Sequence, residues 1–325
     1  MIRAVLGLDT SNYRTSLALV TMNHEILVNV RRLLPVERGE RGIRQCDAVY
    51  AHLKQLKSLM MESADLFSGI QLTAVCASTA PRERKDSYMP VFEAGDTIGR
   101  SISAAMRIPF FPTDHQHGHI RAARFGTDAD HLDSMLTLHL SGGTTDLLCM
   151  KGDSLTPLGT SLDLHAGQLI DRIGVALGLS FPAGPEMEEL AMRGKAEGRL
   201  GCSLDRGTLS CHMSGAEAAA FRWISAQALS PEDIAREIFD FLCRTSLRML
   251  EGGSNQTGLN DALVFGGIAS SFLFREMLEK RLKQNRSRLR VRFGAPELSG
   301  DNAVGVALIG VDRLRREEGD ACENS

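Results

Sequence analysis

The five residues from His115 to His119 hold three histidines, at a spacing that has a geometric meaning. If Thr113 or Asp114 caps a helix that starts here, His115 and His119 lie four residues apart on one face, so both imidazoles can reach the same cation. His117 then points elsewhere. Two imidazoles do not complete a metal site, because a third ligand from a distant part of the chain is normally needed. The spacing alone also fits a solvated helix start that carries histidines.

Asp301 offers a third ligand, since it lies at the tip of a loop before a predicted helix over residues 303–315. The competing interpretation is that Asp301 only caps this helix. Imidazole and carboxylate together suit iron, zinc or manganese, so the residues predict one divalent metal ion without choosing among these. A zinc protease is not indicated, because the histidine pair lacks the adjacent glutamate that such an enzyme uses as base.

Two polar turns follow predicted buried strands, one near the start of the chain and one near its middle. The first strand, over residues 2–8, and the second, over 134–140, are each followed by a further strand, at 15–20 and 147–150. Their hydroxyls and backbone N–H groups can hold a phosphate or a hydrated cation, although a plain polar turn or a Gly-Gly hairpin looks the same. The repetition favours two similar halves. The turn residues are Asp9, Thr10, Ser11, Ser141, Gly142, Gly143 and Thr144.

Two further segments favour nucleotide binding. A predicted helix over residues 163–179 carries Asp171 and is ended by a proline-rich turn that contains Gly184; a solvated helix face is the alternative for Asp171. A predicted buried strand at 263–265 runs through Gly266, Gly267 and Ser271 into a helix N-terminus, where a nucleotide can lie against backbone N–H groups.

The remaining pattern alternates strands with amphipathic helices, which indicates an α/β protein. Residues 81–90 form a charged loop bracketed by prolines. The other predicted strands lie at 25–30, 72–78 and 108–111, and the other predicted helices lie at 41–67, 92–106 and 186–192, from 214 onward, and at 231–251.

The composition is that of an ordinary soluble protein, with 325 residues, 43% of them hydrophobic and 24% charged. No apolar run approaches the ~20 residues of a membrane span, and the N-terminus leads into a strand rather than a signal peptide. The seven cysteines are scattered and form no C-x-x-C, which suits reduced thiols and signals no thiolate metal site. We therefore expect a cytoplasmic protein with no membrane partner.

A net charge of -3 does not indicate nucleic-acid binding by the molecule as a whole, so such binding must depend on a local patch. One basic run has no intervening acid. It fits either an RNA contact or the solvated end of a helix followed by an exposed edge strand. Its basic residues are Lys280, Arg281, Lys283, Arg286, Arg288, Arg290 and Arg292.

In order and spacing, these motifs together resemble the TsaD family of tRNA adenosine threonylcarbamoyltransferases, once called sialoglycoprotein endopeptidases, over nearly the whole chain. Residues 8–11 resemble the family's first phosphate loop and residues 141–144 its second. His115 and His119 resemble its metal histidines and Asp301 its metal aspartate. Residues 162–171 are similar to its ribose-binding helix, 182–185 to its adenine-side turn and 266–271 to its adenosine turn.

The resemblance implies a two-lobed fold of the actin, Hsp70 and sugar-kinase type, with a nucleotide cleft between the lobes. Residues 1–112 would form the N-terminal lobe, 113–302 the C-terminal lobe, and 303–325 a helix that packs back on the first lobe. The implied metal is iron first, then zinc or manganese, held by His115, His119 and Asp301. The implied reaction transfers threonylcarbamoyl from threonylcarbamoyl-adenylate to the exocyclic amine of a tRNA adenosine beside the anticodon and releases AMP. Implied partners are an adenine nucleotide or acyl-adenylate, tRNA, and proteins of the threonylcarbamoylation system.

Several residues depart from the family pattern. Residues 81–90 replace a glycine-rich loop, Arg14 replaces a glutamate, Glu217 a lysine and Ser271 an asparagine. Because the changes at Arg14 and Glu217 are opposite in sign, we hypothesise that the two side chains face each other as an inverted ion pair. The alternatives to the main hypothesis are a divergent carbamoyl-type transferase with another acceptor, a non-catalytic nucleotide-binding partner, and an ATP-dependent kinase or phosphatase on the same fold.

Overall fold

The computed structural model describes residues 1–11, 13–35, 43–83, 87–202, 204–205 and 207–323. Its contacts divide the chain into two compact units, Met1–Phe125 with Asp301–Ser325, and Gly126–Gly300. The first boundary therefore lies after Phe125 and not at residue 112. The reason is that helix α3 (His115–Arg124) packs against α9 (Val304–Glu323) of the first unit, so the histidines belong to that unit and not to the second.

The first unit is built on a five-stranded sheet in the order β3-β2-β1-β4-β5. β1, β2 and β3 are antiparallel, whereas β1, β4 and β5 run parallel. The carboxyl ends of these three parallel strands therefore meet at one edge of the sheet, where polar residues can converge. The strands are β1 (Ile2–Ser11), β2 (Arg14–Thr21), β3 (Ile26–Leu33), β4 (Ile70–Ala80) and β5 (Phe110–Asp114).

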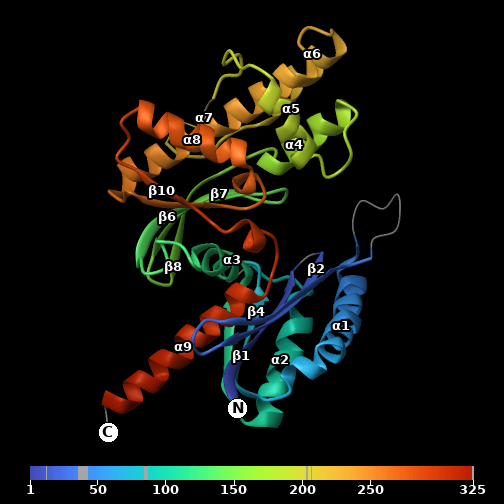
Figure 1. The fold of residues 1–325 in the computed structure, drawn as a ribbon, viewed down its shortest axis with the longest axis vertical. Helices are drawn as coiled ribbons and strands as arrows, with labels where there is room; N and C mark the ends of the chain where they lie inside the picture. The colour runs from blue at the N-terminus through green and yellow to red at the C-terminus, as the bar shows by residue number, and fades with distance from the viewer. Residues whose placement is uncertain (12, 36–42, 84–86, 203, 206, 324–325) are drawn as a thin grey trace. The chain divides into compact units, whose positions relative to one another are not determined.

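Helices cover both faces of this sheet (Figure 1). Leu6 and Leu8 point to the face covered by α1 (Gln45–Glu62) and α2 (Phe92–Met106), where they join the buried apolar cluster. Gly7 points to the opposite face, because successive side chains in a strand alternate. A Cβ atom at Gly7 would lie 2.5 Å from the carbonyl oxygen of Ala303, so glycine lets α9 pack directly on β1.

The second unit repeats this topology, with the sheet order β10-β9-β6-β7-β8. β6, β7 and β8 are antiparallel, whereas β6, β9 and β10 are parallel. The predicted repetition of two halves is thus confirmed at the level of strand order. The strands are β6 (Ser134–Leu140), β7 (Thr145–Lys151), β8 (Ser154–Thr160), β9 (Asp261–Phe265) and β10 (Arg290–Phe293), and the helices are α4 (Ala166–Ala176), α5 (Gly184–Arg193), α6 (Ser214–Ser225), α7 (Pro231–Thr257) and α8 (Phe272–Gln284).

Most predicted elements are present, and their ends differ by a few residues. The helix predicted over 41–67 is α1 from Gln45 to Glu62 followed by a short 3-10 turn, and residues 41–42 lie outside the described residues. The described part of the predicted loop at 81–90 contains no helix or strand; residues 84–86 lie outside it. Strand β8 is absent from the sequence prediction because its Ser, Thr, Pro and Gly residues form a half-exposed edge without apolar alternation.

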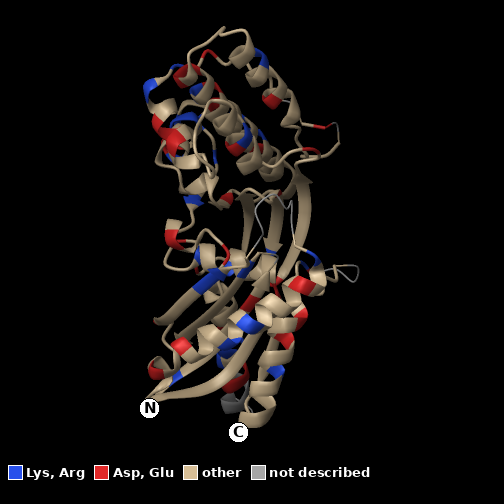
Figure 2. Ribbon diagram, turned by 90° about the vertical axis from the view of Figure 1, so that its right-hand side faces the viewer, with Lys and Arg blue, Asp and Glu red and all other residues tan. Residues whose placement is uncertain are grey.

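Basic and acidic residues are interspersed along the helices rather than being segregated by sign (Figure 2). The six cysteines whose side chains are described are free thiols, and all but Cys46 are buried. Within the described residues, every helix is too short or too polar to cross a lipid bilayer.

His52 lies on the buried face of α1, where its Nδ1 is 2.8 Å from Thr15 Oγ1 and its side chain is 0% exposed. Burial lowers the pKa of His52 to about 4, against a smaller opposing effect of the charge on Asp9. The folded protein thus holds this imidazole neutral, whereas the unfolded chain protonates it below about pH 6.5.

We expect this difference to appear as a loss of stability in acid. Between about pH 6.5 and 4 the unfolded state binds the additional proton, so the free energy of unfolding falls as pH falls, by roughly 3 kcal/mol from His52 alone. The measurement is urea denaturation across this pH range for the wild type and His52→Gln. The difference between the two slopes isolates the histidine from the carboxylates, and parallel slopes would contradict the assignment.

Candidate metal centre and nucleotide-binding elements

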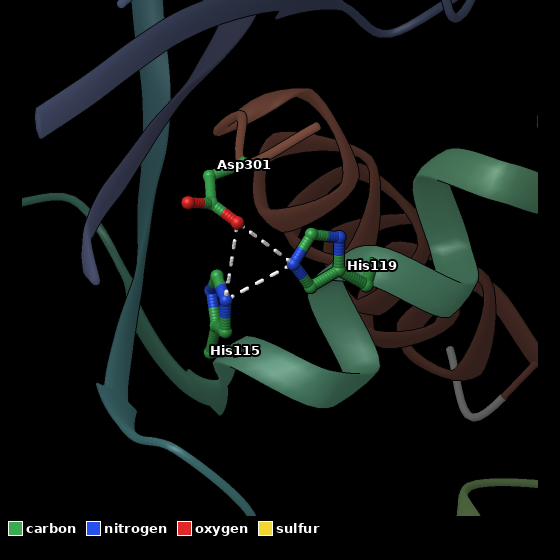
Figure 3. A group of neighbouring side chains, drawn as sticks. All are labelled: His115, His119 and Asp301. Atoms are coloured by element: carbon green, nitrogen blue, oxygen red, sulfur yellow. Dashed lines mark hydrogen bonds and ion pairs between the residues drawn. The ribbon is translucent and has the colours of Figure 1, made fainter. Parts of the chain in front are cut away.

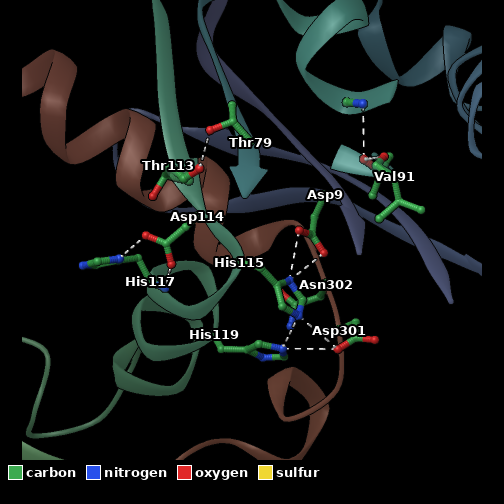
Figure 4. Close-up of polar contacts among 12 residues, drawn as sticks. Asp9, Thr79, Val91, Thr113, Asp114, His115, His117, His119, Asp301 and Asn302 are labelled. Atoms are coloured by element: carbon green, nitrogen blue, oxygen red, sulfur yellow. Dashed lines mark hydrogen bonds and ion pairs between the residues drawn. The ribbon is translucent and has the colours of Figure 1, made fainter. Parts of the chain in front are cut away.

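The histidine stretch forms helix α3, which begins directly at the carboxyl end of β5. Asp114 caps this helix as predicted, since its Oδ1 accepts a hydrogen bond from the backbone N–H of His117 at 3.0 Å. The other carboxylate oxygen of Asp114 contacts Nδ1 of His117. His117 is therefore paired with its own helix cap, and His115 and His119 lie together on a different part of the helix (Figure 4).

His115, His119 and Asp301 converge on one point within the first unit (Figure 3). Nε2 of His119 lies 3.0 Å from Nε2 of His115 and 3.2 Å from Oδ1 of Asp301. The third side of the triangle, from His115 Nε2 to Asp301 Oδ1, is 3.7 Å. Among the described residues, this is the one group of three or more His, Cys, Asp or Glu side chains with ligand atoms near enough to share an ion.

This triangle has the dimensions and chemistry of a divalent metal site. Ligand atoms about 2.1 Å from one cation lie roughly 3 to 3.5 Å from each other, close to the three distances observed here. The two imidazole nitrogens and the carboxylate oxygen direct lone pairs at one another. These lone pairs repel each other unless a proton or a cation lies among them. The donor set of two nitrogens and one oxygen fits iron, zinc or manganese, so the residues fit the metal that the sequence predicts.

Asp9 fixes the orientation of His115. Both carboxylate oxygens of Asp9 lie 3.1 Å from Nδ1 of His115, and the Asp9 side chain is fully buried (Figure 4). Burial lowers the pKa of His115, but the charge of Asp9, the hydrogen bond to it and the charge of Asp301 outweigh burial and raise the pKa to about 9. Because Nδ1 donates to Asp9, Nε2 is the atom that His115 presents to His119 and Asp301.

Asn302, not Asp301, makes the hydrogen bond that starts α9. The side-chain oxygen of Asn302 accepts from the backbone N–H of Val304 at 3.0 Å, which leaves the Asp301 carboxylate directed at the histidines. Burial raises the pKa of Asp301, but the hydrogen bond with His119 and the charges of both histidines and of Arg14 hold it below its usual range. Asp301 is thus ionised, as a metal ligand must be.

The first polar turn places its side chains on two faces of the sheet. Asp9 and Ser11 point to the face of the histidines, with Ser16 opposite Asp9 in the ladder. Among the described residues, the buried hydroxyls of Ser11 and Ser16 have no hydrogen-bond partner. Thr10 points to the other face, where its Oγ1 donates to the carbonyl oxygen of Val91 and accepts from the N–H of Gly95, so it holds the start of α2.

The second polar turn lies between β6 and β7 and packs on the start of α4. Ser141 accepts from the backbone N–H of Gly167 through its carbonyl oxygen, and the loop is closed by a hydrogen bond from the Ser141 N–H to the Thr144 carbonyl oxygen at 2.8 Å. The N–H of Gly143 donates to Ser141 Oγ at 3.4 Å. A Cβ at Gly167 would lie 2.6 Å from the backbone nitrogen of Gly142, so helix and turn lie in close contact.

Asp171 lies on α4 and braces the turn that leads to α5. Its Oδ1 accepts from the backbone N–H of Ala183 at 2.8 Å, next to Gly184 at the start of α5. Burial raises the pKa of Asp171 against the lowering effect of this hydrogen bond. The carboxylate thus has one structural contact and is half-buried, with its second oxygen available for other donors.

Asp163 is a residue whose role the sequence does not reveal. Burial raises its pKa, but hydrogen bonds from the backbone of Met213, Ser214 and Leu164 and from the Ser214 hydroxyl lower it to about 2. This carboxylate ties the loop before α4 to the start of α6, which explains why α4 begins at Ala166 and not at residue 163.

The third predicted nucleotide element follows β9, the parallel neighbour of β6. Gly266 has a φ of +100°, and a Cβ there would lie 2.4 Å from the carbonyl oxygen of Leu140, so only glycine fits beside the end of β6. Gly267 follows, and Ser271 caps α8 by accepting from the N–H of Phe274 at 3.1 Å. The glycine turn and the Ser141–Thr144 turn thus meet at the same sheet edge.

The two charge changes at Arg14 and Glu217 lie in different units. Arg14 begins β2, and its charge lowers the pKa of Asp301. Glu217 lies on α6 and accepts from Nη1 of Arg172 at 3.1 Å. The charge of Arg14 thus acts on Asp301 and Glu217 pairs with Arg172, each within its own unit, so an inverted pair between Arg14 and Glu217 is not needed to explain either residue.

Comparison with known families decides the relationship. The model of TsaD, described as tRNA N6-adenosine threonylcarbamoyltransferase, matches residues 89–308, more than half of the chain. The chain belongs to the TsaD family. A TsaD-family protein of Aromatoleum aromaticum named tRNA N6-adenosine threonylcarbamoyltransferase is 29% identical over 95% of this chain and 91% of its own. A protein of the same name from Methanopyrus kandleri is 27% identical over 94% of this chain and 86% of its own length.

A longer relative, from Methanocaldococcus jannaschii, is named a probable bifunctional tRNA threonylcarbamoyladenosine biosynthesis protein. It is 25% identical over 94% of this chain, which matches 54% of its length. The TsaD resemblance and the expectation of an acyltransferase enzyme are therefore confirmed.

Solved structures confirm the predicted fold class. HypF of T. kodakarensis matches 97% of this chain and 48% of its own with a TM-score of 0.62 at 14% identity. The ROK hexokinase of Thermus thermophilus matches 97% of this chain over 99% of its own length, with a TM-score of 0.54 and 17% sequence identity. These likenesses place the chain among sugar-kinase-like and actin-like α/β folds and carry no information on its substrate.

Proposed function

We propose that this TsaD-family enzyme transfers a threonylcarbamoyl group from threonylcarbamoyl-adenylate to the exocyclic amine of a tRNA adenosine beside the anticodon, with release of AMP. The observation that carries the proposal is the convergence of His115, His119 and Asp301 in a chain that belongs to this family. A non-catalytic scaffold has no need of such a ligand set. The proposal places the reaction in the cytoplasm, which suits the free thiols.

His115, His119 and Asp301 would hold one divalent metal ion, with iron favoured by the family resemblance and zinc or manganese as alternatives. When bound, such an ion supplies Lewis acidity and a template for carbonyl and phosphate oxygens. Asp9 contributes by holding His115 through Nδ1, which keeps Nε2 directed toward His119 and Asp301.

The residues around this centre favour binding and orientation over covalent catalysis. The unpartnered hydroxyls of Ser11 and Ser16 lie on the Asp9 face and can donate to substrate oxygens, and Arg14 adds positive charge near Asp301. The incoming amine attacks the carbamoyl carbon, the bond from this carbon to the phosphate oxygen breaks, and AMP carries away the electron pair while the amine nitrogen releases one proton to solvent. The reaction thus requires no nucleophilic side chain, and proximity supplies much of the rate.

The second unit would hold the adenylate. Its phosphate would lie near the Ser141–Thr144 turn, its ribose near Asp171 and its base near Gly184 and the Gly266-Gly267 turn. The support for this assignment is that both glycine-bearing turns follow the carboxyl ends of neighbouring parallel strands, where ligands bind in α/β sheets.

We expect Asp171→Asn to weaken adenine nucleotide binding by about 1.5 to 3 kcal/mol, because hydrogen bonds to a charged carboxylate contribute on this scale. Asparagine keeps an oxygen that can accept from the Ala183 N–H, so the turn before α5 remains in place. Isothermal titration with ATP or AMP measures the effect, and an unchanged melting temperature serves as the fold control. Equal affinity for both proteins would remove Asp171 from the site.

Protein partners are a further part of the proposal, supported by the relative whose name describes two functions in one longer chain. A second catalytic function that is fused in one relative can be supplied by a separate protein in another. The RNA partner is the acceptor itself.

The test of the proposed function is transfer of labelled threonylcarbamoyl from the adenylate to an unmodified tRNA transcript. We expect one label per transcript, placed on the adenosine beside the anticodon, with AMP released in equal amount. Release of AMP with the label on another acceptor would replace the tRNA by a different substrate. Failure of both transfer and AMP release, with metal and nucleotide bound, would reject the transferase assignment.

A further inference from the structure

A basic pocket of about 490 Å³ lies wholly within the second unit, among the end of α5, helix α7 and helix α8. Its cationic lining comes from three separate segments: Lys195 after α5, Arg236 on α7, and Lys280 and Arg281 on α8. Asp240 is the one carboxylate that lines it. The lining therefore carries a net charge of about +3 in a chain whose net charge is -3.

Buried acceptors hold the two guanidinium groups in place. Asp240, whose side chain is 6% exposed, accepts from Arg281 and also from Nε of Arg244 at 2.6 Å. Its charge is thus shared by two arginines and leaves little to neutralise the pocket. Arg236 donates from Nη1 to the carbonyl oxygen of Ala191 at 3.4 Å. An arginine has five N–H donors, so Arg236 and Arg281 each retain several for a ligand.

The positive charge continues beyond the pocket along the exposed end of α8. Lys283 is exposed in the last turn of α8, and Arg286 and Arg288 are exposed in the segment that follows it. Arg290 and Arg292, in contrast, both pair with Asp261 at the edge of the sheet. The basic run found in the sequence therefore divides into a structural part on β10 and a part on and after α8, of which Lys280 and Arg281 line the pocket. Four cations in the lining and three exposed ones near the end of α8 and after it are more than a single small anion needs.

The chemistry of the lining favours phosphate over bases. The described residues that line the pocket include no aromatic side chain on which a base could stack, and Met277 is their one large apolar side chain. Guanidinium groups match the geometry of phosphate oxygens, and the Gln284 amide can donate to phosphate or ribose oxygens. Such a site recognises a chain of phosphates without selecting their sequence.

We propose that this pocket and the adjoining end of α8 bind the sugar-phosphate backbone of RNA. The choice of tRNA as that RNA rests on the proposed function, whereas the pocket assignment rests on the charge and geometry of α5, α7 and α8. The pocket then anchors the acceptor away from the reacting adenosine and contributes affinity rather than chemistry.

The test compares RNA binding by the full chain and by the variant Lys195→Gln/Arg236→Gln/Lys280→Gln, which keeps Arg281 paired with Asp240. Fluorescence anisotropy with an unmodified tRNA transcript is measured from 50 to 300 mM salt. We expect an affinity loss of about 10- to 100-fold at low salt. The slope of the logarithm of affinity against the logarithm of salt concentration should become smaller by roughly 2 to 3, because each lost phosphate contact reduces this slope by about 0.7 to 0.9.

The matched control is Lys54→Gln/Lys57→Gln/Lys151→Gln, which removes three positive charges from exposed positions outside the pocket. It is expected to bind RNA within about threefold of the wild type. Equal losses in both triple variants, or no RNA binding by the wild type, would overturn the proposal. If the pocket variant fails to fold, the single exposed change Lys280→Glu replaces it, with Lys57→Glu as its control.

Two further readouts separate this inference from the proposed function and from a protein partner. If the wild type binds RNA through the pocket but does not transfer threonylcarbamoyl, the pocket assignment stands and the proposed function is rejected. A poly-glutamate peptide whose binding is lost in the pocket variant while RNA binding is unchanged would overturn the RNA assignment in favour of an acidic protein partner.

Discussion

Asp301→Ala is expected to lose its bound metal and to reduce threonylcarbamoyl transfer by more than about 100-fold. Asp301 supplies the one carboxylate of the triangle, and without it the two imidazole nitrogens 3.0 Å apart lack a third ligand and the charge that this ligand brings to a divalent cation. The loss should exceed the 10- to 100-fold effects of residues that only support a ligand. Metal content after dialysis and the rate of transfer are the two measurements.

The matched control for this variant is His117→Ala. His117 lies on the same helix as His115 and His119, the two proposed ligands, but pairs with Asp114, so its removal should leave the metal content at the wild-type level. Full metal occupancy in Asp301→Ala, or equal metal loss in both variants, would contradict the assignment of ligands.

Asp9→Asn is expected to weaken metal binding about 10- to 100-fold while the protein remains folded. Asparagine has nearly the size of aspartate but presents no charge. Its neutral amide oxygen is a weaker acceptor for the Nδ1 proton of His115, and its NH2 group can instead donate to Nδ1. The proton bound by His115, whose pKa lies near 9, competes with the metal in the wild type. Metal titrations at pH 7 and pH 9.5 separate this competition from the loss of orientation.

A readout independent of activity is the side-chain nitrogen spectrum of His115 in the metal-free protein at pH 9.5. We expect the Nδ1-protonated tautomer to dominate in the wild type and a mixture of tautomers in Asp9→Asn. Ser16→Ala changes a neighbouring side chain on the same face without touching Nδ1 and serves as the control. An unchanged tautomer and unchanged metal affinity in Asp9→Asn would remove Asp9 from this role.

The local part of the metal site follows from the sequence, and its distant part does not. The four-residue spacing of His115 and His119 and the cap at Asp114 depend only on helix geometry, so they could be predicted. The loop-tip position of Asp301 left two interpretations open, a third ligand or a helix cap. Only the family resemblance favoured the ligand, because spacing carries no signal between residues so far apart. The contact of Asp9 with His115, across 106 positions, was missed because the turn at Asp9 resembles a phosphate loop.

The fold shows the same division between local and tertiary information. The repeated pattern of a strand, a hydroxylated turn and a strand predicts two similar halves, and both sheets indeed share one strand order. The predicted boundary between the units was wrong because α3 belongs to the first unit. It does so through its packing on α9, and no sequence pattern indicates that contact. Asp163 likewise braces two loops through hydrogen bonds to backbone N–H groups far along the chain.

The most direct test of a metal-dependent transferase is a titration of metal into the chelated protein, with transfer from threonylcarbamoyl-adenylate to unmodified tRNA followed at each addition. Transfer should be absent at the start, rise in proportion to the metal bound by His115, His119 and Asp301, and reach its plateau at about one ion per chain. A chelated protein that already transfers at the full rate would contradict the account.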